Sequence, residues 1–479
     1  MVVGGRHGVL VELLAEVGWS VSRLAHEVNR EVGAGYVSRT TVSEWVNCSR
    51  VPRQPLPTVV AHVLSQASGR VVSVGCLWPG TAGSAEWVSA DVGTQVSWDL
   101  WGTKALVNGW FTSGGAMLGG DRRSFMALSG AALTVPAWQY VDRVKDVPDV
   151  GAFERALGGS GVSSPKVSAA LVEYFQTLVG AFRRIDDLEG GSPENLKHVD
   201  NAIGQVNSYL KHGTFTSSDV APKLLGVLAQ MCQTGGWMAV DAESHGLAQR
   251  YYRMGLQAAH SAGDHDLGAV LLACMSYQAA NRQQAHEASE LGAAAMRVSR
   301  SAHPLVRTVV MARVAHAQAA AGDARGFRSS TQKSAELFER AQEVGGGPEY
   351  LYWLDSSMAE TVAGQGVLLL TLRNARGAKS QLEEAERLLA AEVTQTGPDR
   401  PRDAYYHGAW LARAHVKRGD LYRGLSAAQG VVDGVGTISS PRTRRVLGDL
   451  DKDLANLRSD RNLREVRQLR KQMQAVLAA

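Results

Sequence analysis

Apolar residues recur every three to four positions along most of the chain, which is the spacing of amphipathic helices. Near the N-terminus this pattern is interrupted at Gly18 and again at the segment GAGY, residues 33–36. The pattern predicts four short helices there, at residues 9–17, 19–29, 38–46 and 57–67. Short helices joined by such turns are typical of a helix-turn-helix unit.

The predicted helix at 38–46 has one apolar face and one polar face. Ser20 and Ser38 stand where an N-cap residue is expected for the second and third helices. Val42 and Trp45 are three residues apart and are expected to face inward. This leaves four residues on the outer face of the third helix: Arg39, Thr40, Ser43 and Glu44.

From residue 164 onward the pattern predicts one helix after another. Two helices, at 164–182 and 192–210, begin with Ser-Pro, a favourable helix start. Five helix pairs and a last helix then follow, at 223–239 with 243–261, 265–281 with 284–299, 303–320 with 324–343, 351–372 with 378–395, 403–418 with 420–434, and 459–477. Gly-Asp turns recur between these helices. Pairs of this length predict a solenoid of degenerate tetratricopeptide-like repeats.

The segment between these regions differs in composition. It is rich in glycine, and six of the eleven tryptophans lie from Trp78 to Trp138. We therefore expect an all-α protein of three parts. They are a helix-turn-helix DNA-binding domain at 1–80, a Trp- and Gly-rich connecting region at 81–163, and an α-solenoid with a capping helix at 164–479.

Composition narrows the classes of function. Hydrophobic residues make up 45% of the chain and charged residues 20%, which is ordinary for a folded protein. No apolar run approaches the roughly 18 residues of a membrane span, and the N-terminus lacks the pattern of a secretory signal. The four cysteines are far apart in the sequence. We expect a cytoplasmic protein with no membrane partner and no disulfide framework.

The sequence contains no pattern that predicts catalysis. There is no Gly-rich phosphate loop, HExxH or GxSxG motif, and the thirteen histidines are scattered. We therefore expect no enzyme, no catalytic residue, no metal and no cofactor.

Positive charge is concentrated near the C-terminus. Residues 440–472 contain ten Lys or Arg against five acids, whereas the whole chain carries a net charge of only +4. Apolar residues of the last helix form one stripe, which predicts a capping helix with one polar face. A dimer contact or an auxiliary DNA clamp is the alternative.

The polar face of the third helix is the candidate DNA-reading surface. A recognition helix reads base edges with residues near its N-terminus, and arginine can donate two hydrogen bonds to guanine. The candidate base contacts are Arg39, Thr40, Ser43 and Glu44. The candidate phosphate contacts are Arg23, Ser38, Arg50 and Arg53. The competing interpretation is a helical packing unit whose polar face only meets solvent.

The segment SVSRLAHEVN…SRTTVSEWVNCSRVPR resembles the lambda-repressor-like, or XRE, helix-turn-helix domain. The following ASGRVVSVGCLWPG is similar to the corresponding ending in actinobacterial regulators. Three body segments, at 123–138, 235–264 and 271–280, are similar to parts of large actinobacterial regulators that carry tetratricopeptide-like repeats. The resemblance implies a transcriptional regulator, often a repressor of sporulation or antibiotic production. The link at 29–37 is longer than in the compact phage repressors.

A helical solenoid has a concave surface, and such surfaces hold peptides or small molecules. Polar and aromatic residues of the central repeats are the candidate ligand pocket: Arg183, Arg184, Asp187, Trp237, Asp241, Gln249, Tyr252, Tyr277 and Asn281. Trp237 and Tyr252 also fit a purely structural place in the core. The paired arginines and aspartates near 183–187 also fit a local ion-pair cluster.

These patterns together predict a homodimeric, nucleoid-associated regulator of a two-fold symmetric double-stranded DNA operator. Its body is expected to bind a small-molecule or peptide effector, and the regulator to repress development or secondary metabolism. The alternative is an interaction scaffold whose repeats bind a protein and whose DNA contact is weak or vestigial. The substitution Arg39→Ala separates the two, because only a DNA reader depends on that side chain.

Overall fold

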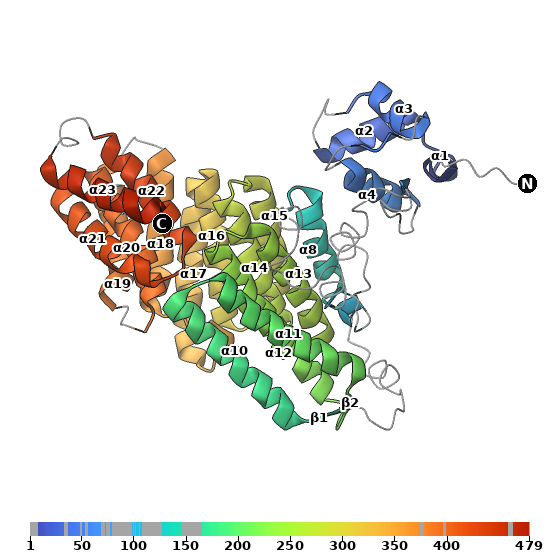
Figure 1. Ribbon diagram of the computed structural model, residues 1–479, viewed down its shortest axis with the longest axis horizontal. Coiled ribbons are helices and arrows are strands. Elements are labelled where there is room, and N and C mark those ends of the chain that lie inside the picture. Colours follow the sequence, from blue (N-terminus) through green and yellow to red (C-terminus); the bar gives the residue numbers. More distant parts are fainter. Residues whose placement is uncertain are drawn as a thin grey trace, which may run out of the picture. The chain divides into compact units, whose positions relative to one another are not determined.

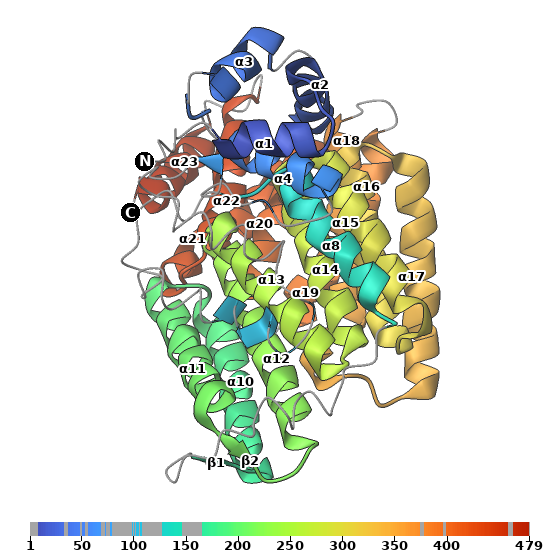
Figure 2. The ribbon, with the colours of Figure 1, turned by 90° about the vertical axis from the view of Figure 1, so that its right-hand side faces the viewer.

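The computed structural model divides the chain into two compact units, the first mainly residues 1–97 and the second mainly 137–479. Both units are helical (Figures 1 and 2). The structure describes residues 8–32, 37–47, 50–52, 56–68, 72, 77–78, 98, 100, 102–104, 106–107, 127–145, 165–373, 378–395, 399–457 and 463–478. Across these residues the fold is all-α, as predicted, with a single pair of two-residue strands. No helix in these ranges is both long enough and apolar enough to span a membrane.

The first unit contains the four predicted helices within a few residues of the expected ends. They are α1 (Gly8–Glu16), α2 (Val21–Val32), α3 (Arg39–Asn47) and α4 (Leu56–Ser68). The hydroxyls of Ser20 and Ser38 accept hydrogen bonds from the backbone N–H three residues later, at 3.1 Å each. The two serines therefore begin α2 and α3 as predicted. Apolar side chains from all four helices form one core.

The ends of α2 and α3 are joined by a side-chain bridge. The Asn29 amide donates to the Val37 carbonyl and accepts from the Val37 N–H, both at 2.8 Å. Because the oxygen and the nitrogen of the amide both form hydrogen bonds, Asn29 holds the residue that precedes the cap of α3 against α2.

The helical-repeat body of the second unit begins with a short parallel pair, β1 (Lys166–Val167) and β2 (Thr214–Phe215), and two long helices, α10 (Ala169–Glu189) and α11 (Pro193–His212). Five helix pairs follow in sequence order. They are α12 (Val220–Asp241) with α13 (His245–Ala262), α14 (His265–Asn281) with α15 (Ala285–Val298), α16 (Pro304–Ala321) with α17 (Ala324–Val344), α18 (Ser356–Arg373) with α19 (Ala378–Gln395), and α20 (Pro401–Arg418) with α21 (Leu421–Gly434). The partners of each pair pack together, which confirms the helical-repeat solenoid.

The structure differs from the predicted elements at several places. The helix that was predicted at 164–182 with a Ser-Pro start begins at Ala169, after β1, with Ser168 as its N-cap residue. Residues 349–351 form a 3-10 turn, η3, so α18 begins at Ser356 and not at 351. A helix that we did not predict, α22 (Pro441–Ala455), follows the fifth pair. The last helix, α23, runs over Arg464–Ala478 and packs on α21 and α22. Before the body, α8 (Ala131–Arg143) lies in the predicted connecting region, most of which is outside the described residues.

Three Gly-Asp turns join helices as predicted, at 263–264, 322–323 and 419–420. The glycines have left-handed φ values of 73°, 86° and 92°, which a residue with a Cβ adopts at a cost. Each aspartate accepts a hydrogen bond from the N–H three residues later, at 2.9–3.2 Å. One dipeptide thus ends one helix and caps the next.

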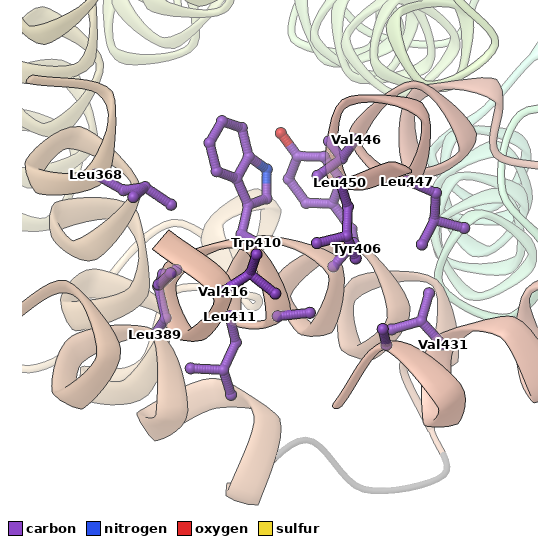
Figure 3. Close-up of a cluster of buried hydrophobic side chains, with 14 of the residues drawn as sticks. Leu368, Leu389, Tyr406, Trp410, Leu411, Val416, Val431, Val446, Leu447 and Leu450 are labelled. Carbon is purple, nitrogen blue, oxygen red and sulfur yellow. The ribbon is translucent and has the colours of Figure 1, made fainter. Parts of the chain in front are cut away.

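The helical array of the second unit closes on itself. Helix α10 packs on α12 and also on α20, and α12 packs on α22, so the first and last repeats meet. At this closure the Ser439 N–H donates to the Glu189 carbonyl at 2.6 Å. Figure 3 shows part of the core of the last repeats, where side chains of α18 to α22 converge around Tyr406 and Trp410. The sequence predicted a concave surface, and in the structure the first and last repeats both contribute to the wall of a cavity.

Candidate nucleic-acid interface and ligand pocket

The face of α3 opposite its polar residues is buried, so the polar face points away from the core of the first unit. Val42, Trp45 and Val46 are all buried in the core of the first unit. Arg39 and Thr40, in the first turn, are exposed. The structure therefore places two of the four predicted base-reading residues, Arg39 and Thr40, in the N-terminal part of α3, which is the part that enters a major groove in helix-turn-helix proteins.

Several of the candidate DNA contacts have partners within the protein. Arg50 forms an ion pair with Glu44 at 2.8 Å, and Arg23 forms one with Glu27 at 2.5 Å. Ser43 is half-buried and accepts a hydrogen bond from the Asn47 amide at 2.9 Å.

The remaining predicted contacts are less engaged. Among the residues that the structure describes, no carboxylate lies within 4.0 Å of the exposed Arg39 guanidinium, which leaves its donors for another acceptor. Ser38 is exposed and serves as the cap of α3. Arg53, the last candidate phosphate contact, lies outside the described residues.

A cavity of about 740 Å³, measured out to its opening, lies within the helical-repeat body. Side chains of α10, of the first helix in every pair and of α22 form its wall, together with residues in and just after η3. Because both ends of the array contribute, the cavity depends on the closure of the body.

One arginine in the wall is shared among three carboxylates. Arg402 lies 2.7 Å from Asp186, 3.0 Å from Asp403 and 3.4 Å from Asp187. All four side chains are buried. Burial raises the pKa of Asp186 to about 8, and Arg402 offsets only part of this effect because two other carboxyl groups share it. The cluster joins α10, at the start of the body, to α20, near its end.

A second buried arginine, Arg442 on α22, is matched by one carboxylate. Its Nε lies 3.0 Å from Asp241 on α12, and the Ser440 hydroxyl donates to the same oxygen at 2.9 Å. The guanidinium also lies over aromatic rings, 4.0 Å from the centre of Tyr406 and 5.0 Å from that of Trp237. This contact, like the Arg402 cluster, crosses the closure.

Arg313 on α16 is held by aromatic rings. Its guanidinium carbon lies 4.2 Å from the ring centre of Tyr277, 5.0 Å from that of Trp237 and 5.7 Å from that of Trp353. The side chain lines the cavity, and the residue is only 6% exposed. Within the described ranges, no carboxylate forms an ion pair with it and no side chain or backbone oxygen accepts a hydrogen bond from it.

Arg183 on α10 is the fourth arginine of the wall, and its partners are weak. It donates to the Gln230 side chain at 2.8 Å and lies 4.0 Å from Glu349, whose side chain is largely exposed. Its guanidinium carbon also lies 5.9 Å from the ring centre of Tyr352.

Two arginines make the electrostatic field at Tyr277 positive. Burial by itself would raise the pKa of the Tyr277 hydroxyl, but Arg442 and Arg313 outweigh burial and lower it. Burial, with Arg313 nearby, lowers the pKa of His316 to about 3. Burial also lowers the pKa of His407 to about 4. Both histidines are therefore neutral at pH 7, and the arginines carry the positive charge.

Four of the nine predicted pocket residues line the cavity together: Arg183, Asp187, Trp237 and Tyr277. The other five do not. Asp241 lies behind the wall, paired with Arg442. Arg184 is exposed on α10, whereas Gln249 and Tyr252 are buried on α13. Asn281 ends α14, where its amide donates to the Tyr277 carbonyl at 2.8 Å.

Sequence reasoning missed Arg313, Arg402 and Arg442, which dominate the charge of the cavity. A signal was present in the sequence for one of them, because Arg313 interrupts the otherwise apolar run VVMARVA of α16. Among the described residues, no group of three or more His, Cys, Asp or Glu side chains is placed to hold a metal ion.

Comparison with known proteins gives one match, confined to the first unit. Residues 10–77, which include most of α1 and all of α2 to α4, match the family model of the SP15 N-terminal domain. No curated protein and no solved structure matches the chain.

Proposed function

We propose that this protein is a sequence-specific, DNA-binding transcriptional regulator, acting as a repressor, whose helical-repeat body binds an effector. The observation that carries the proposal is the face of α3. Ser38 caps the helix, Trp45 anchors it in the core, and the exposed Arg39, in the first turn, has no ion-pair partner among the described residues. That arrangement supports readout of base edges in a major groove.

The charge of the first unit favours a dimer as the binding species. Arg23 and Arg50 pair with carboxylates of the same unit, so a phosphate must compete for each of them. A single head of this kind has few free cations for the DNA backbone. Two heads on a two-fold symmetric operator would double the contacts, which supports a homodimer on double-stranded DNA.

The cavity in the body supports the sensing part of the proposal. It lies among helices from both ends of the array, so its wall includes both sides of the closure. An effector changes DNA affinity only if it binds one arrangement of the protein better than another. A ligand that strengthens or loosens the closure meets that requirement.

The test is binding-site sequencing of the purified full-length protein on fragmented genomic DNA of its source, with Arg39→Ala in parallel. Arg30→Ala is the matched control, because Arg30 is an exposed arginine of the same unit outside the α3 face. We expect a recurring two-fold motif with the wild type and the control, and its loss with Arg39→Ala. Binding without a motif, or the same motif in all three proteins, would support the scaffold alternative instead.

A further inference from the structure

The four arginines and four carboxylates in or directly behind the cavity wall are equal in number but unevenly paired. Four carboxylates lie in or directly behind the wall, and two arginines account for all of them. Arg402 forms ion pairs with Asp186, Asp187 and Asp403, and Arg442 forms one with Asp241. The wall therefore has two further guanidinium groups, those of Arg313 and Arg183, without a buried carboxylate partner among the described residues.

Of these two arginines, Arg313 is the better candidate for binding a ligand. A guanidinium has five N–H donors, and the aromatic faces of Tyr277, Trp237 and Trp353 stabilise its charge without accepting conventional hydrogen bonds. A charge that is removed from water without a counterion is costly to the folded state. The donors of Arg313 are therefore available to an acceptor that enters the cavity.

A cationic ligand fits this site poorly. Aromatic cages recognise cations through their ring faces, but these faces already carry the protein's own cations. Arg313 lies over Tyr277, and Arg442 lies over Tyr406, at 4.2 Å and 4.0 Å from the ring centres. The lowered pKa of Tyr277 points the same way, because it reflects the positive charges of Arg442 and Arg313 beside this ring.

The wall also includes surface that suits an uncharged molecular body. Tyr350, Trp353, Met358 and Val362 supply apolar and aromatic surface from η3, from the segment after it and from α18. Gln365 and Thr234 supply neutral polar groups. A charged anchor beside apolar surface suits a small amphipathic molecule.

We propose that the cavity binds a small organic acid, with its carboxylate or phosphate on Arg313 and its apolar body against Trp353, Met358 and Val362. This inference deepens the proposed function and rests on its sensing half, since it names the chemical class of the effector. Arginine is the side chain best suited to the anionic group, because its planar fork matches both carboxylate and phosphate oxygens.

The test uses two fluorescent probes that differ only in the acid group. The first is 8-anilinonaphthalene-1-sulfonate, and the second is N-phenyl-1-naphthylamine, which is the same molecule without the sulfonate. Each is titrated into the full-length protein in the absence of DNA. We expect the anionic probe to bind about tenfold tighter or more, as a charge-assisted hydrogen bond provides. Equal affinities of the wild type for the two probes would overturn the proposal.

Variants then locate the binding site. Arg313→Gln should reduce the ratio of the two affinities to about one, whereas Arg313→Lys should keep a preference for the anion because it keeps the charge. Arg307→Gln, on the same helix but outside the wall, is the matched control and should leave the ratio unchanged. An unchanged ratio in Arg313→Gln contradicts the assignment. If that variant melts without a cooperative transition, the wild-type ratio and Arg313→Lys decide, and loss of the preference in Arg313→Lys contradicts it.

The outcome is independent of DNA reading. Neither probe titration involves the first unit's α3 face, and Arg39→Ala should bind both probes as the wild type does. A protein that binds the anionic probe but no operator would retain the pocket assignment and lose the regulator. A protein that binds an operator but shows no preference between the probes would lose the pocket assignment alone.

Discussion

At the residue scale, two buried carboxyl groups hold protons more tightly in the folded protein than in the unfolded chain. Burial raises the pKa of Asp186 to about 8, although Arg402 lies 2.7 Å away. Burial also raises the pKa of Asp200 to about 7, although the Tyr251 hydroxyl donates to it at 2.6 Å. Both groups are therefore partly protonated near neutral pH, and each makes folding depend on pH.

We expect the free energy of unfolding to fall as the pH rises from about 6.5 to about 8. In that range the folded state binds protons on Asp186 and Asp200 that the unfolded chain has released. His316 and His407, whose pKa values are lowered to about 3 and about 4, act in the opposite direction only below the ordinary histidine pKa of 6.5. Urea unfolding at constant ionic strength measures the slope.

The variant Asp186→Asn should flatten this slope, because it removes the larger of the two shifts and keeps an oxygen toward Arg402. Asp219→Asn is the control, since hydrogen bonds from Lys223 and Ser217 lower the pKa of Asp219 to about 2, outside the window. A slope as steep in Asp186→Asn as in the wild type would show that Asp186 is already ionised at neutral pH.

At the scale of the helical elements, α12 and α13 approach closely through a pair of glycines. A Cβ on Gly236 would clash with the ring of Tyr252, which is fully buried. A Cβ on Gly235 would lie 2.9 Å from the ring of Tyr251. The absence of side chains at these two positions lets both tyrosine rings lie directly on the backbone of α12. This contact holds α12 and α13, the two helices of the first pair, close together.

Gly236→Ala should therefore destabilise the body by about 1–3 kcal/mol, the usual cost of overpacking a core. Gly226→Ala lies on the same helix, where a Cβ would have no neighbour within 4 Å. There the change should stabilise the body by about 0.5–1 kcal/mol, because alanine favours helix. Denaturant unfolding of the two variants checks the pair. Equal effects of the two changes would mean that helix propensity alone decides at both sites.

The helices could be predicted from the sequence because each depends on apolar residues three and four positions apart. Gly-Asp turns and serine caps marked many of their ends. Helix α22 was missed although Ser440 and Pro441 repeat the start used correctly for α11. Its sequence is so rich in charge that the apolar stripe of Val446, Leu450 and Leu454 is easily overlooked.

The cavity could be predicted only in part, for a different reason. Trp237 and Tyr277 are conspicuous within their own helices. Arg402 and Arg442 look locally like surface residues, and they are buried because the array closes and brings α20 and α22 against α10 and α12. Contacts between residues some 200 positions apart, such as Arg402 with Asp186, have no local signal.

At the scale of the whole molecule, the closure of the body depends on charged groups buried between its first and last repeats. Arg402 and Arg442 each cross it to reach carboxylates on α10 and α12. Buried ion pairs contribute little net stability over apolar packing, but removal of one partner leaves a buried charge uncompensated. The closure is therefore specific, and it is sensitive to any change in the charge of the cavity.

Arg402→Gln should destabilise the body by roughly 3–5 kcal/mol, because Asp187 and Asp403 then lose their shared cation. Lys223→Gln is the control, since Lys223 pairs with Asp219 on the exposed surface, where water screens the pair. Thermal and denaturant unfolding of both variants measure the difference. A midpoint for Arg402→Gln equal to that of the control would mean that the closure is held by apolar packing alone.

The proposed regulatory function depends on base reading by α3, and one titration tests this most directly. Wild type, Arg39→Ala and Arg30→Ala are titrated by fluorescence anisotropy against the recovered operator and its single-base variants at one salt concentration. We predict that Arg39→Ala loses about 1–3 kcal/mol on the operator and no longer distinguishes bases at one position of each half-site. Equal affinities of all three proteins, or a loss with Arg39→Ala that is the same on every sequence, would contradict base reading by α3.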